Sequence, residues 1–124
     1  ENSAGQKGKI GTLDEITQIF AEIKSDRLKI CLDTAHLFES GTDIAELDKF
    51  TLLNNVACLH LNDSKTAFDS RNDQHANLGE GEIGLEKLKQ FVNHPKLNHL
   101  PLILEVPGEL GFPDAKNISI AKSL

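Results

Sequence analysis

Apolar side chains recur along this chain at the spacing of helices that bury one face. Residues 12–24 show the pattern most clearly, with an apolar residue every three or four positions. Thr12 followed by Glu15 forms the capping-box pattern that starts a helix at this point. Further helices are predicted at residues 44–54, 84–93 and 114–124.

Three short, almost continuous apolar runs alternate with these helices, at residues 28–33, 56–61 and 100–105. Strands of this kind, separated by helices, are typical of a parallel sheet covered on both faces. The segment between the second strand and the next helix, residues 62–83, is long, polar and rich in glycine. A long loop after a strand of such a scaffold usually carries function. We therefore predict an α/β fold with a functional loop at residues 62–83.

The composition of the 124 residues, 39% apolar and 26% charged, is that of a single globular domain or a part of one. The sequence lacks methionine, so we expect Glu1 to be an internal residue of a longer protein. No apolar run approaches the roughly 18 residues needed to cross a bilayer. Cys31 and Cys58 lie in apolar runs without a pairing motif, which favours a reducing, cytoplasmic compartment.

Each predicted strand ends in a side chain that can bind a metal, namely Asp33, His60 or Glu105. In a (β/α)₈ barrel the active site is built at the carboxyl ends of the strands. Strand alternation places all three side chains on one face and the neighbouring leucines on the helix-covered face. Taken alone, such a residue is more often a helix cap, a loop hydrogen-bonding group or a core histidine than a ligand, but the shared phase of all three favours a common site.

Two further imidazole and carboxylate groups extend this candidate site. His36 follows Asp33 by three residues, where the chain leaves the strand. Asp73 and His75 lie in the long loop, two residues apart, so they share a face in an extended chain. A solvated loop is the alternative for that pair. Imidazole and carboxylate ligands without a thiolate motif favour Zn²⁺ or Mn²⁺.

The formal charge of −6 is unlike that of most nucleic-acid-binding proteins, which carry a basic surface. Bound divalent cations would offset this negative charge, because three Zn²⁺ ions would bring it to zero. Any basic surface of a longer protein would also lie outside these residues.

Six stretches of the sequence resemble the endonuclease IV family of zinc-dependent abasic-site nucleases. In family order they are residues 1–6, 31–36, 60–65, 70–75, 78–84 and 102–105. The resemblance implies that residues 1–124 form a single partial domain, the C-terminal half of a (β/α)₈ TIM barrel of the xylose-isomerase type. It also implies three zinc ions in the full-length chain. One of these sites is incomplete here, because it needs two histidines from the earlier half of the barrel.

The resemblance assigns seven metal ligands: Glu1, Asp33, His36, His60, Asp73, His75 and Glu105. Glu1 would bridge two ions, and Glu1 or Glu105 would also be catalytic by orienting or deprotonating a bridging water. Lys65 and Arg71 are candidates for DNA phosphate contacts, although exposed loop cations are an equally good interpretation. Three side chains, Asn62, Asp63 and Glu80, are predicted to hold the imidazole N–H groups of the ligands. Gln74 departs from the family, which often has a basic residue there.

The implied reaction is hydrolysis of the phosphodiester bond 5′ to an abasic site in double-stranded DNA, as in base excision repair, by a full-length monomer. Clustered cations suit this chemistry because they acidify bound water and neutralise phosphate charge. Two alternatives stay open. One is a metal-dependent sugar isomerase or epimerase of the same barrel type, with one or two metals. The other is a zinc-binding fragment without catalytic activity.

Overall fold

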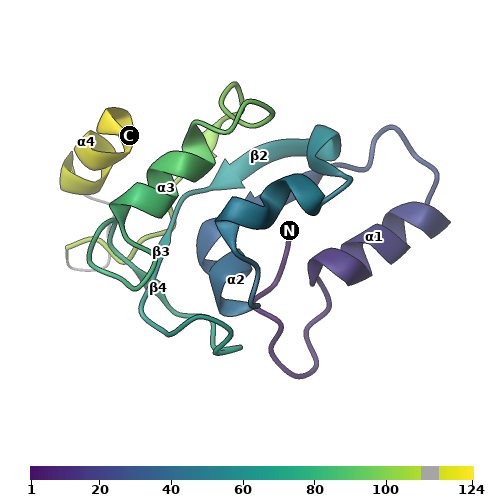
Figure 1. The fold of residues 1–124 in the computed structure, drawn as a ribbon, viewed down its shortest axis with the longest axis horizontal. Coiled ribbons are helices and arrows are strands. Elements are labelled where there is room, and N and C mark those ends of the chain that lie inside the picture. The colour runs from purple at the N-terminus through teal and green to yellow at the C-terminus, as the bar shows by residue number, and fades with distance from the viewer. Residues whose placement is uncertain (110–114) are drawn as a thin grey trace.

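A three-stranded parallel sheet forms the centre of the computed structural model, which describes residues 1–109 and 115–124 (Figure 1). The strands are β1 (Ile30–Asp33), β2 (Val56–His60) and β5 (Leu102–Ile103), in the order β1-β2-β5. Asp33 lies opposite His60 in the register of β1 and β2. The parallel sheet predicted from the apolar runs is therefore confirmed, with strands shorter than the runs that predicted them.

Three helices agree with the predicted amphipathic segments. They are α1 (Leu13–Glu22), α3 (Leu85–Val92) and α4 (Ala115–Ser123). The capping box at the start of α1 is present, with Glu15 N donating to Thr12 Oγ1. Figure 1 shows α1 and α4 at opposite ends of the molecule, with α3 beside α4. The first residue of the predicted last helix, residue 114, lies outside the described residues.

A short helix directly after β1, α2 (Thr34–Glu39), was not predicted from the sequence. It begins because Asp33 acts as its N-cap, where Oδ1 accepts a hydrogen bond from His36 N (3.0 Å). Apart from His36, every residue of α2 is buried. The strand therefore turns at once into a buried helix that carries one predicted metal ligand.

The prediction of a single helix at residues 44–54 is wrong. The segment makes two 3₁₀ helices instead, η1 (Ile44–Lys49) and η2 (Leu53–Asn55). Phe50 between them has an extended backbone (φ −77°, ψ 109°), which interrupts the helical hydrogen bonds. The apolar side chains that suggested a helix are nevertheless buried in the core, among them Ile44, Leu47 and Leu53.

The long loop after β2 contains an antiparallel hairpin of β3 (Asp63–Ser64) and β4 (His75–Ala76). The buried carboxylate of Asp63 organises the return of the chain, because it accepts four main-chain N–H groups from residues 79–84 at 2.9–3.4 Å. Gly81 lies so close that a Cβ there would be 2.3 Å from the main-chain oxygen of Ser64. The loop is thus a built part of the fold.

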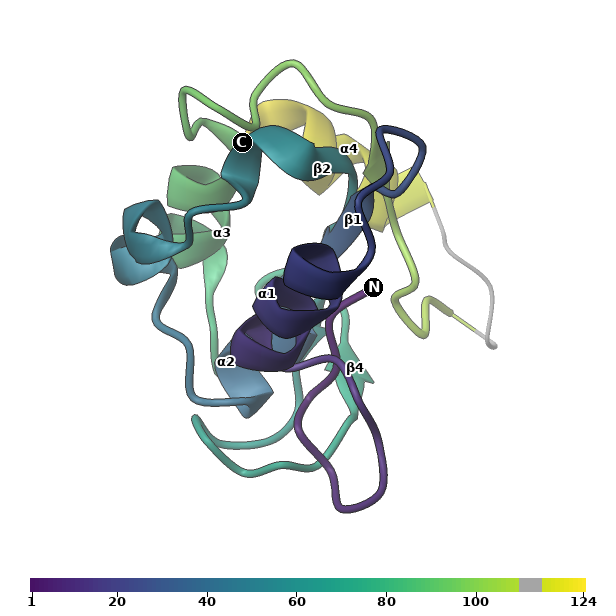
Figure 2. The same ribbon diagram turned by 90° about the vertical axis from the view of Figure 1, so that its right-hand side faces the viewer.

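The two faces of the sheet differ in burial. Leu32, Leu59 and Leu61 are fully buried toward the helices, whereas Cys31 and Cys58 on the opposite face are half-buried. Figure 2 shows the N-terminal end of the chain lying beside β1. Within the described residues, no helix is both long and apolar enough to cross a membrane.

Candidate metal centre

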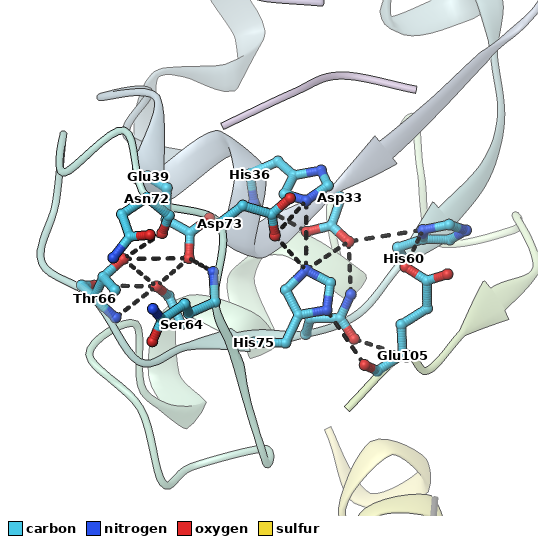
Figure 3. Close-up of polar contacts among 12 residues, drawn as sticks. Asp33, His36, Glu39, His60, Ser64, Thr66, Asn72, Asp73, His75 and Glu105 are labelled. Carbon is cyan, nitrogen blue, oxygen red and sulfur yellow. Dashed lines mark hydrogen bonds and ion pairs between the residues drawn. The ribbon is translucent and has the colours of Figure 1, made fainter. Parts of the chain in front are cut away.

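All seven predicted ligands lie at the carboxyl edge of the parallel sheet. Asp33 and His60 end β1 and β2, and Glu105 follows β5 by two residues. His36 extends from α2, and His75 from β4. Figure 3 shows these side chains, with Asp73, pointing toward one another from different parts of the chain. Glu1 reaches the same place, because its carboxylate contacts His60.

The first cluster consists of Glu1, Asp33, His60 and Glu105. The His60 ring nitrogen Nδ1 lies 2.9 Å from Glu1 Oε1, 3.0 Å from Glu105 Oε2 and 3.7 Å from Asp33 Oδ2. One ring nitrogen carries at most one proton, so it cannot satisfy three carboxylates. The four ligand atoms lie within 4.8 Å of one another, which fits a single divalent cation bound between them.

The second cluster consists of Asp33, His36, Asp73 and His75. His36 Nε2 lies 3.2 Å from Asp73 Oδ1, and His75 Nε2 lies 3.6 Å from the same oxygen. The two imidazole Nε2 atoms face each other at 3.4 Å, and Asp33 Oδ2 lies 3.8 Å from His75 Nε2. Asp33, His36 and His75 each offer a ligand atom within 4.8 Å of the others, and Asp73 contacts both imidazoles, so the nitrogen and oxygen atoms gathered here suit Zn²⁺.

Asp33 belongs to both clusters and is fully buried. Its Oδ2 faces the clusters and accepts a hydrogen bond from Asn62 Nδ2 at 2.6 Å, while Oδ1 caps α2. Burial raises the pKa of this carboxyl, against the opposing effect of His36 and of its hydrogen bonds. A buried carboxylate in this position needs a nearby positive charge. The structure thus combines the two interpretations of Asp33, helix cap and candidate ligand.

The electrostatics of the second cluster favour a charged pair between His36 and Asp73. Burial opposes the charged form of His36, but the carboxylates of Asp33 and Asp73 outweigh it and raise the His36 pKa. Partial burial likewise opposes ionisation of Asp73, but His36 and the side chain of Gln6 lower its pKa. Protonation of His36 therefore competes with metal binding, because the proton would occupy the ring nitrogen Nε2 that faces Asp73.

Main-chain oxygens orient two of the imidazole rings. His36 Nδ1 contacts the main-chain oxygen of Asn2 at 2.9 Å, and His75 Nδ1 contacts that of Glu105 at 3.3 Å. Each ring therefore directs Nε2 into the cluster. Sequence reasoning missed Asn2, whose amide also bonds Asp33 N (2.7 Å) and Asp33 O (3.2 Å). Its position next to Glu1 was the only available signal.

The contacts described for Asn62, Asp63 and Glu80 are with groups other than the imidazole rings. Asn62 instead binds the Asp33 carboxylate and accepts from Glu105 N at 2.8 Å. Asp63 binds main-chain N–H groups of the loop, and Glu80 contacts Asn77 and Lys116. The reason is that His36 and His75 already have main-chain carbonyl partners. Asn62 supports the ligands by holding Asp33 and Glu105.

The two candidate phosphate-binding residues lie on the exposed part of the loop. The Lys65 side chain is exposed, and its main-chain N–H donates to Gln74 O. Arg71 has a left-handed backbone (φ 56°) and pairs with Asp69 Oδ1 at 2.7 Å. A role of either residue in binding DNA stays a prediction.

A parallel sheet with helices between its strands, and with histidine and carboxylate side chains gathered at its carboxyl edge, is typical of the TIM-barrel class. The sequence model of one such family, AP endonuclease family 2, described as a xylose isomerase-like TIM barrel, matches residues 1–122. The chain therefore belongs to this family, and its fold is part of such a barrel.

Known relatives are similar over most or all of this chain. A probable endonuclease 4 from Mycoplasmopsis agalactiae is 42% identical over 115 residues, which cover 86% of this chain and 41% of the relative. A probable endonuclease 4 from Sulfurihydrogenibium is 40% identical and covers all of this chain, with 48% of its own length. The crystal structure of endonuclease IV from Thermus thermophilus superposes with a TM-score of 0.82 at 36% identity, over 98% of this chain and 47% of that one. This chain thus spans about half the length of the relatives it matches.

Proposed function

We propose that this chain supplies most of the metal centre of a zinc-dependent endonuclease that cleaves DNA 5′ to abasic sites in base excision repair. The convergence of seven carboxylate and imidazole side chains at one sheet edge carries this proposal. The names of the relatives, endonuclease 4 and endonuclease IV, support the class of reaction. The activity belongs to a longer, cytoplasmic and monomeric protein, in which the earlier half of the barrel completes a third zinc site.

The two clusters divide the ligands between them. Glu1, Asp33, His60 and Glu105 would hold one zinc ion, and Asp33, His36, Asp73 and His75 another. Bound zinc ions acidify water and neutralise the charge of the phosphate and of the leaving oxygen. In the first cluster, Glu1 and Glu105 are the partly exposed carboxylates, with 37% and 45% of the side chain exposed, whereas Asp33 is fully buried. Glu1 and Glu105 are therefore the groups placed to accept a proton from an attacking water.

DNA would approach the exposed side of the centre. Lys65 and Arg71 lie on the loop that carries Asp73 and His75, so phosphate contacts there would place the backbone without reading its sequence. Selection for abasic sites would rest on a pocket that accepts an extruded nucleotide. That pocket requires residues of the whole barrel.

The deciding experiment compares this chain with a version joined to the N-terminal half of the Sulfurihydrogenibium relative, on a duplex with one abasic site. We expect incision on the 5′ side by the joined protein, and little or none by the 124 residues alone. Metal analysis of the joined protein should give three zinc ions per chain. Two metals per chain without incision would favour a sugar isomerase or epimerase. Zinc binding without turnover of either substrate class would favour a non-catalytic role.

A further inference from the structure

The buried carboxylate of Glu39 connects helix α2 with the loop that carries two proposed ligands. Glu39 is fully buried at the end of α2, one turn after His36. Its Oε1 accepts hydrogen bonds from Ser64 Oγ at 2.6 Å and from the main-chain N–H of Gln74 at 3.1 Å (Figure 3). Its main-chain oxygen accepts from Arg71 N at 2.9 Å. Through these bonds, Glu39 connects helix α2 with Ser64 at the start of the loop and with residues 71–74 further along it.

The bond from Gln74 is decisive because this residue separates Asp73 from His75. Its main-chain N–H is held by Glu39, and its main-chain oxygen accepts from Lys65 N at 2.8 Å. With the main-chain N–H and oxygen of Gln74 both held, the side chains on either side of this residue are directed together toward the second cluster. Asp73 Oδ1 and His75 Nε2 indeed lie 3.6 Å apart there.

The surroundings of Glu39 are otherwise unfavourable for a carboxylate. Within residues 1–109 and 115–124, Oε2 is buried without a hydrogen-bond partner. Burial raises the pKa of this carboxyl, against the bonds from Ser64 and Gln74. Leaving a polar atom buried and unpaired costs free energy, because the atom loses its hydrogen bonds to water. The bonds made by Oε1 must therefore offset that cost, and what they stabilise is the position of the loop.

We propose that Glu39 is a positioning residue that sets Asp73 and His75 in place before a metal ion arrives at the second cluster. It does so through Ser64 and Gln74 and touches no ligand side chain itself in the contacts described above. Ligands that are already ordered lose less conformational freedom on binding, so the ion binds more tightly. The expected effect on metal binding rests on the proposed function, whereas the expected ordering of the loop does not.

Hydrogen exchange in the metal-free chain tests the ordering directly. In Glu39→Ala, the amide of Gln74 should exchange at least about tenfold faster, because a local opening cost of about 1.4 kcal/mol corresponds to that factor. Amides of β1 and β2 should keep their protection. Glu39→Gln retains an acceptor oxygen and should restore most of the protection. Glu46→Gln, on the exposed face of η1, is the matched control and should change nothing.

Co²⁺ titration, followed by its visible absorption, tests the consequence for the metal. Glu39→Ala should weaken binding at the second cluster by about 10-fold or more, whereas Glu39→Gln and Glu46→Gln should resemble the unmodified chain. Should Glu39→Ala fail to fold, Ser64→Ala removes the 2.6 Å bond to Glu39, together with the contacts of Ser64 Oγ with Thr66, and leaves the bond from Gln74 to Glu39 in place. It should shift both readouts in the same direction by less.

The outcomes separate the inference from the proposed function. Unchanged exchange at Gln74 in the alanine variants overturns the positioning role. Equal losses in Glu39→Gln and Glu39→Ala also overturn it, because they would show that the charge and not the hydrogen bonds matters. If the unmodified chain binds no Co²⁺ while exchange at Gln74 responds to Glu39→Ala, the metal centre of the proposed function fails, and the role of Glu39 toward a metal fails with it.

Discussion

At the scale of single residues, the side chain of Asp33 has both a structural role and a proposed ligand role. One carboxylate oxygen starts helix α2, and the other faces both ligand clusters and Asn62. Its main-chain N–H and oxygen are held by the Asn2 amide. Hydrogen bonds therefore hold both carboxylate oxygens and the main chain of Asp33, which gives a ligand shared between two ions a fixed orientation.

Asp33→Asn should weaken Zn²⁺ binding at both clusters by at least about tenfold, the lower end of what even supporting residues contribute. Asparagine caps a helix as well as aspartate does, so α2 should persist. Isothermal titration gives the affinities, and circular dichroism reports the fold. Asp43→Asn is the matched control, because Asp43 caps η1 by accepting from Ala45 N, away from the clusters. Unaltered affinities in Asp33→Asn would remove this residue from the metal centre.

Asn62→Ala should lower Zn²⁺ affinity by about 10–100-fold without removing any ligand. The reason is that the Asn62 amide holds both the Asp33 carboxylate and the main chain of Glu105. The number of ions bound at saturation should stay the same. Asn93→Ala, at the exposed end of α3, serves as the control for loss of an asparagine side chain. A lower stoichiometry at saturation would show that Asn62 does more than support the ligands.

Among the elements, those with a strong local pattern were predictable and those built by tertiary contacts were not. The capping box and apolar stripe of α1 and the apolar runs of β1 and β2 depend on neighbours along the chain. Helix α2 has six residues, too few for a periodic pattern, and starts from a strand-end aspartate. The 3₁₀ helices at residues 44–55 have the apolar spacing of an α-helix, but the main chain between them is extended at Phe50.

The candidate site shows the same division. Strand alternation alone directed Asp33 and His60 to one face, and the structure places them opposite each other. The supporting contacts of Asn2 and Glu39 join segments at least 25 residues apart in the sequence, so no local pattern marks them. An acidic residue in a stretch expected to be a loop is ordinarily solvated, and Glu39 is instead fully buried.

The capping box gives α1 a pH-dependent contribution. Main-chain N–H groups of Gly11 and Thr12 donate to Glu15 at 2.8 and 2.9 Å and lower its pKa. Because the folded-state pKa lies below the unfolded value of 4.5, the carboxylate stabilises the fold above that pH. This contribution is lost as the pH falls through the lower, folded-state pKa.

Glu15→Gln should therefore be less stable than the unmodified chain at neutral pH, with the difference shrinking below pH 4.5. Urea unfolding at a series of pH values measures it. Glu22→Gln, at the exposed far end of the same helix, is the matched control. A difference that is constant across the pH series would show that the charge of Glu15 contributes nothing.

At the scale of the whole molecule, the ligands join distant segments around a centre rich in negative charge. The chain carries a net charge of −6, and four of the seven candidate ligands are carboxylates. Their mutual repulsion opposes the folded state when no cation is bound. Ions bound at the two clusters would reduce the repulsion and together connect five segments of the chain, so folding and metal binding should be linked.

Zinc should accordingly raise the Tm of this chain, and EDTA should lower it. At a free zinc concentration 100 times the Kd, linkage for one site corresponds to about 2.7 kcal/mol. Differential scanning fluorimetry over a series of zinc concentrations measures the shift, with Asp33→Asn as the variant expected to respond least. A Tm that is independent of zinc in the unmodified chain would contradict the proposed centre.

The order in which the ligands occur along the chain has a consequence for assembly. The second cluster draws on residues 33–75, whereas the first also requires both Glu1 and Glu105. Because closing a longer loop costs more entropy, a refolding or emerging polypeptide can complete the inner set of ligands well before the outer one. We expect the first ion captured during biogenesis to enter between His36 and His75, and the centre then to be filled outward from there.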